Sequence, residues 1–289
     1  MRLRLGVMAA LGAVAGLAAP AAAADPLMLK PAAAWTINYG DDSCQLVRQF
    51  GQGDQRATLA IEQVGPADQV NLIVSGPAVA ERIDSPHAEI AFLPGGERSS
   101  RAYRRARMAD GTLVFALDGV PLALFAGVDE DNRRATGIPT VTVARANRIS
   151  TIAVSQAIEP LWFQTGPMGE AMEALHACTE DLVRHWGVDP ATLGPVARVE
   201  GNPGSWITAS DYPKAALRGT GPGRVNFLVS VDPEGKPSAC RVLGGEQAAA
   251  LGATICDAMM RRAHFKPARD ARGHAVPSFW SSGVLFAGL

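Results

Sequence analysis

Residues 223–232 constrain the fold more than any other segment, because apolar and mostly polar side chains alternate there with a period of two. The apolar positions are Val225, Phe227, Val229 and Val231. The turn 232–235 follows, with Pro233 and Gly235 where a tight hairpin turn needs them. A second strand that ends at Val242 is therefore expected to run antiparallel to the first.

A helix and a further strand complete this unit. Between about Glu246 and Ala263 apolar residues recur at helical spacing, and Arg261 and Arg262 complement the dipole at the helix end. The last strand is expected at about 276–286, after a break at 272–273. Upstream, Tyr212-Pro213 opens a short helix through Leu217. The pattern predicts a three-stranded antiparallel sheet with two helices on one face.

Together with the segment 265–268 (Phe-Lys-Pro-Ala), these elements resemble the C-terminal domain of TonB-family proteins, periplasmic modules of the Gram-negative envelope. The resemblance covers residues about 206–289 and none of the upstream region. It implies a binding module whose last strand is the docking edge for a short peptide, the TonB box of an outer-membrane transporter. The residues of this edge are Ser278, Phe279, Trp280, Ser281, Ser282, Gly283, Val284, Leu285 and Phe286.

The docking edge has a simple physical basis. Three strands leave exposed edges, and an extended peptide can add itself as a further strand. A homodimer through the same edge is an alternative, as is a strand that only completes the sheet. Replacement of Ser282 by proline is expected to remove a donor from this edge and to weaken partner binding.

The chain departs from an energy transducer in three respects. Its N-terminal apolar segment lacks an intramembrane polar residue, a long proline-rich spacer is missing, and a β-rich region fills the middle. We therefore expect an adaptor in TonB-dependent transport or a related envelope process, without catalysis. The alternative is an envelope enzyme or carrier, with a deep pocket of converging polar groups in residues 25–195 and the C-terminal module used for docking.

Residues 1–24 have the pattern of a signal peptide. Arg2 and Arg4 precede an apolar stretch, and Ala22-Ala23-Ala24 offers a cleavage site before Asp25. An uncleaved membrane anchor is the alternative, because the stretch from Leu5 to Ala24 carries no charge. Either outcome predicts export, and cleavage predicts a soluble periplasmic protein.

The mature chain is expected to be α+β and to contain two units. Residues 25–195 hold short strands, near 35–39, 58–61, 70–74, 88–93 and 112–117, that favour a sandwich or barrel-like sheet. One amphipathic helix is expected at 169–186. Residues 188–210 are rich in glycine and proline turn signals, and 196–210 are interpreted as a linker before the C-terminal domain, 211–289.

The four cysteines are Cys44, Cys178, Cys240 and Cys256. In an oxidising periplasm an even number favours disulfides, although four buried thiols are the alternative. Three pairings are open, and pairing within each unit, Cys44 with Cys178 and Cys240 with Cys256, is the simplest.

Neither charge nor motifs indicate a nucleic-acid, metal or cofactor site. The formal net charge is −1, so no general attraction to nucleic acid is expected. The segment 98–107 is rich in arginine, which predicts either a patch for anionic envelope polymers or a solvated strand. His176 and Cys178 diverge on the predicted helix, and Gly-x-Ser-x-Gly and Cys-x-x-Cys motifs are missing.

Overall fold

The computed structural model describes residues 25–80, 87–95, 98–125, 137–155, 160–211, 223–245, 247–270 and 272–286. The predicted signal peptide, residues 1–24, and the predicted helix from Tyr212 to Leu217 lie outside these ranges. The described part is mixed α and β, and the predicted β-rich N-terminal region is confirmed.

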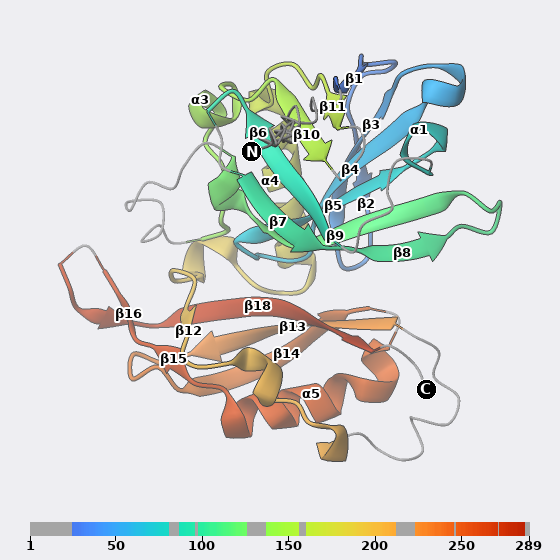
Figure 1. Cartoon of the computed structure of the whole chain (residues 1–289). Coiled ribbons are helices and arrows are strands. Elements are labelled where there is room, and N and C mark those ends of the chain that lie inside the picture. The colour runs from blue at the N-terminus through green and yellow to red at the C-terminus, as the bar shows by residue number, and fades with distance from the viewer. Residues whose placement is uncertain are drawn as a thin grey trace, which may run out of the picture.

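Two sheets form the N-terminal region (Figure 1). The larger has six strands, all antiparallel to their neighbours, in the order β2 (Thr36–Tyr39), β3 (Cys44–Phe50), β4 (Ala57–Gln63), β5 (Gln69–Ser75), β9 (Leu113–Pro121) and β8 (Arg104–Arg107). The smaller has five strands in the order β1 (Leu27–Leu29), β11 (Leu161–Phe163), β10 (Thr151–Ser155), β6 (His87–Leu93) and β7 (Arg98–Ala102). Its pair β1–β11 is parallel.

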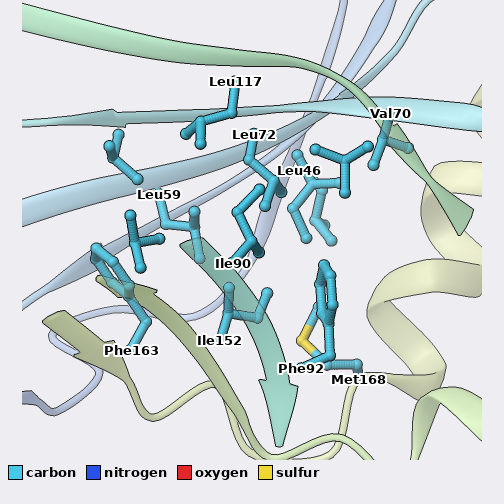
Figure 2. Packing of buried hydrophobic residues seen from close by; sticks show 14 of the residues in the cluster. Leu46, Leu59, Val70, Leu72, Ile90, Phe92, Leu117, Ile152, Phe163 and Met168 are labelled. Carbon is cyan, nitrogen blue, oxygen red and sulfur yellow. The ribbon is translucent and has the colours of Figure 1, made fainter. Parts of the chain in front are cut away.

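The core of this region lies between the two sheets (Figure 2). Leu59 and Leu72 from the larger sheet face Ile90 and Ile152 from the smaller one. All four side chains are fully buried. Each such side chain stabilises the fold by about 1.5–3 kcal/mol relative to an exposed position, so the buried positions of the alternating strands contribute strongly to the stability of the region.

Helix α4 (Gly169–His185) closes one end of the sandwich. Its buried face includes Leu175 and Leu182, and the disulfide Cys44–Cys178 joins it to β3. Gly187 follows with a φ of 74°, the left-handed conformation in which a helix commonly ends. Shorter helical segments are η1 (Gly53–Gln55), α1 (Pro77–Ala80), η2 (Leu122–Leu124), α3 (Val143–Ala146), η3 (Pro190–Thr192), η4 (Pro203–Ser205) and η5 (Ala209–Asp211).

The C-terminal module is a three-stranded antiparallel sheet in the order β14 (Pro237–Gly244), β13 (Gly223–Val231) and β18 (Ser278–Phe286). Helix α5 (Ala248–Arg262) packs on one face, and the disulfide Cys240–Cys256 joins it to β14. Four two-residue strands form two further pairs: β12 (Arg198–Val199) pairs with β15 (Phe265–Lys266), and β16 (Ala268–Arg269) pairs with β17 (Ala275–Val276).

The second face of this sheet lies against the N-terminal region (Figure 1). Leu228 and Phe279 from the sheet pack in one buried cluster with Val183 of α4 and with Leu193. Of the positions between the apolar residues of β13, Asn226 and Leu228 are therefore buried and Arg224 and Ser230 are partly buried. This explains why Leu228 stands among the more polar residues of that face.

Candidate functional site: the outer edge of strand β18

The pairing of β18 with β13 fixes which main-chain groups of β18 face outward. The two strands pair in continuous register along all nine residues of β18, from Ser278 opposite Val231 to Phe286 opposite Gly223. In such a pair, successive residues direct their N–H and C=O groups alternately toward the partner strand and away from it. One residue of known direction therefore fixes the direction of all the others.

Hydrogen bonds at Phe279 and at Arg224 independently give the same direction for the main-chain groups of β18. Phe279 donates its N–H to the carbonyl of Pro195 at 3.3 Å and accepts from the N–H of Ala197 at 2.6 Å, so its groups point away from β13. Arg224 of β13 lies opposite Leu285, and its carbonyl accepts from the N–H of Gln247 on the far side of β13. Because this carbonyl points away from β18, the main-chain groups of Leu285 also point away from β13. The outward-facing residues of β18 are therefore Phe279, Ser281, Gly283 and Leu285.

This geometry corrects the expectation for Ser282. Its N–H belongs to the ladder with β13, where it lies opposite Phe227. Proline at this position would break the sheet of the module and would not test its edge. The sequence alone could not show whether the even-numbered or the odd-numbered residues direct their N–H groups outward, because both alternatives place the same residues in the strand.

Residues 194–197, where the N-terminal region meets the linker, already occupy the beginning of the edge. Val196 forms an isolated parallel bridge with Phe279, flanked by the two hydrogen bonds of Pro195 and Ala197. The approach is close at Gly194, where a Cβ atom would lie 2.1 Å from the carbonyl oxygen of Pro277. A short segment of the chain itself thus adds to β18 in the way that a bound peptide would.

Accessibility increases toward the end of β18. Ser281 is only 4% exposed, because its side chain lies under the N-terminal region near Gly65. Gly283 is exposed, and Leu285 is 46% exposed. Within the described ranges, no hydrogen bond is recorded for the outward main-chain groups of these three residues. We refer to Gly283–Leu285 as the open end of β18.

Two polar contacts hold the N-terminal region against β13 beside this open end. Asn226 donates from Nδ2 to Oδ2 of Asp42 at 2.8 Å. Asp118 accepts from Arg224 at 2.9 Å and from Arg104 at 2.5 Å and 3.0 Å. Burial by itself would raise the pKa of Asp118, but the hydrogen bond from Arg104 and the charge of Arg224 outweigh it and hold that pKa below its usual range.

Aromatic side chains fix β18 from the helix side of the sheet. The ring of Trp280 lies 5.7 Å from those of Trp206 and Phe265 and 5.6 Å from that of Phe227, measured between centroids. The contacts with Trp206 and Phe227 are edge-to-face, and such contacts add to the stabilisation that comes from burial. Trp206 belongs to the linker, so the cluster also ties the linker to the sheet.

The arginines of 98–107 are engaged within their own region. Arg98 pairs with Glu89, Arg104 pairs with Asp118, and Arg105 contacts Tyr103 through a hydrogen bond and its ring face. These contacts favour the interpretation as a solvated strand over an anionic polymer site. Within the described residues, no three side chains of the kinds that bind metals come together.

Neither long helix in the described part of the chain has the length and apolar character needed to cross a membrane. Both predicted disulfide pairings, Cys44–Cys178 and Cys240–Cys256, are present.

Comparison with known families agrees with the geometry of the module. The model of the family described as Gram-negative bacterial TonB protein C-terminal matches residues 208–279, so this part of the chain carries a TonB C-terminal domain. The match ends within β18 and includes none of the N-terminal region. No curated protein and no solved structure matches the chain.

Proposed function

We propose that this chain is an exported, periplasmic adaptor of the Gram-negative envelope whose C-terminal module binds an extended segment of another envelope protein. The segment adds to the outer edge of β18 as a new strand, with main-chain hydrogen bonds that supply affinity. The partner that the TonB-like domain favours is the TonB box of an outer-membrane transporter. A second copy of the chain at the same edge is the competing occupant.

The proposal rests on the outward main-chain groups of β18, which are paired with another segment at one end of the strand and exposed at the other. The pairing of Val196 with Phe279 supports the proposal, because a short segment of the chain already adds to this edge there. Gly283 and Leu285 present the same kind of groups in an exposed position. A segment that binds only the open end fits beside the linker, whereas a longer one displaces the linker from Phe279.

The test uses the purified mature protein and a synthetic TonB-box peptide from an outer-membrane transporter of the source organism. Leu285→Pro removes one outward N–H but no bond to β13, because the N–H of Leu285 points away from that strand. We expect the variant to bind the peptide about tenfold more weakly in calorimetric titration. Leu285→Ala keeps the N–H and serves as the matched control, with a smaller loss.

Three results separate the possibilities. A folded Leu285→Pro protein that binds the peptide as tightly as the wild type contradicts docking at this edge. A similar loss in both variants assigns the affinity to the side chain of Leu285 instead of the backbone. Concentration-dependent dimerisation that Leu285→Pro abolishes would identify a second copy as the occupant.

A further inference from the structure

A cavity of about 910 Å³ lies where the N-terminal region, the linker and β18 meet. Its walls come from the segment 137–141, from the α4 side chains His176, Glu180 and Arg184, from the linker residues 196–199, and from Trp280. Cavities of about 300–1,000 Å³ that join apolar walls to a few polar groups are typical of small-molecule sites. Trp280 comes from the same strand whose outer edge is the proposed docking site.

Most charged groups around the cavity are already paired. Glu180 contacts Arg184 at 2.9 Å and His176 at 3.5 Å, and Arg184 also contacts Asp181. Asp189 accepts from the N–H of Ala191. The charge of Arg184 offsets that of Glu180, and a main-chain donor holds Asp189 in its own turn, so these side chains are already engaged.

Besides Arg145, which lines the cavity and is itself engaged, two side chains of opposite charge remain. Asp68, from the loop between β4 and β5, and Arg198, from β12, both line the cavity and are both exposed. Within the described ranges no ion pair is recorded for either side chain. Although Asp68 is an exposed residue, desolvation of its carboxyl group raises the pKa of that group, which fits an anion that lacks a cation beside it.

The walls between these charges are apolar, and they include Leu122, Ile138, Val141, Val196 and Trp280. A ligand that satisfies the whole cavity therefore carries one positive charge, one negative charge and apolar groups. We propose that the cavity binds a short apolar peptide with free termini, its ammonium group at Asp68 and its carboxylate at Arg198. This site shares Val196 and Ala197 with the occupied beginning of the β18 edge, but it does not depend on the proposed adaptor function.

The test measures binding of di-, tri- and tetrapeptides of leucine and alanine to the full mature chain by calorimetric titration. At least one length should bind, and an N-acetyl or C-amide cap should each weaken binding by about three- to tenfold, the effect of one partly screened ion pair. Asp68→Asn should remove the effect of the acetyl cap alone. Arg198→Gln should remove the effect of the amide cap alone.

Matched variants control for general changes of charge. Asp54→Asn and Arg272→Gln alter exposed groups that do not line the cavity, and both should bind as the wild type does. Ala191→Trp places a large ring at an exposed position of the wall and should abolish binding without unfolding the chain. Peptides that do not bind, that bind equally with or without caps, or that still bind Ala191→Trp unchanged would overturn the proposal.

Discussion

The N–H of Ala197 donates to the carbonyl of Phe279 at 2.6 Å, so the linker forms a short added strand at the beginning of the edge that we propose as the docking site. The two ends of this edge therefore differ. Its first outward position is occupied by the chain itself, and Gly283 and Leu285 at its other end are exposed. A partner that uses the full strand competes with residues 195–197.

Gly194→Ala tests this competition. A Cβ atom at position 194 would lie 2.1 Å from the carbonyl oxygen of Pro277, so the linker must move away from β18. We expect the free energy of unfolding to fall by about 1–3 kcal/mol. The N–H of Phe279 should exchange faster, because it loses its bond to Pro195.

The control for this prediction is Gly204→Ala, further along the chain in the linker. A Cβ atom there meets only the end of the Asn202 side chain, at 3.2 Å, and this side chain can shift. Equal exchange of the Phe279 amide in both variants would show that the linker is not held by close approach at Gly194.

Arg224→Met tests the contact between the two units. The side chains of Arg224 and Asp118 are only 19% and 32% exposed, so this ion pair is screened less than a surface pair. We expect a loss of about 1–2 kcal/mol in urea unfolding. Arg98→Met breaks the exposed pair with Glu89 and should change stability by less than about 0.5 kcal/mol. Equal effects of both variants would contradict a specific role for Asp118.

The same contact predicts a dependence on pH. The pKa of Asp118 is lowered in the folded chain, so its contribution is complete above the usual aspartate pKa of about 4 and is lost as the pH falls through the lowered value. The stability difference between the wild type and Asp118→Asn should therefore shrink between about pH 5 and pH 2. A difference that grows on acidification would contradict this assignment.

The two disulfides should differ in their effect on stability. Cys44 and Cys178 are 134 residues apart, and Cys240 and Cys256 are 16 apart. In the chain-entropy model the first link stabilises by about 4–5 kcal/mol and the second by about 3 kcal/mol. Replacing both cysteines of one link by alanine, followed by urea unfolding, measures the contribution of that link to stability. A larger loss from the shorter link would show that local packing outweighs loop closure.

Much of the module could be predicted because its local signals agree. The alternation from Val225 to Val231, the turn at Pro233 and Gly235, and the helical spacing of Leu251 and Ile255 all describe one hairpin and one helix. In the N-terminal region the same period-two signal indicated strands. It could not show that they divide into two packed sheets, because partners such as β5 and β9 are far apart in the sequence.

The contacts that shape the site were beyond local reasoning. Nothing around Asp42 or Asp118 indicates that these acids meet Asn226 and Arg224 across the chain. Leu228, an apolar residue on the polar face of β13, is the one visible sign that this face is covered. The direction of the Ser282 N–H required a register, and the register depends on the tertiary pairing.

Amide hydrogen exchange along β18, resolved by residue with NMR, tests the central claim most directly. In the free protein the amides of Gly283 and Leu285 should exchange quickly, while those of Ser282 and Val284, which belong to the ladder with β13, should exchange slowly. Saturation with the TonB-box peptide should slow exchange at Gly283 and Leu285. Saturated binding that leaves both amides unprotected would contradict strand addition at this edge.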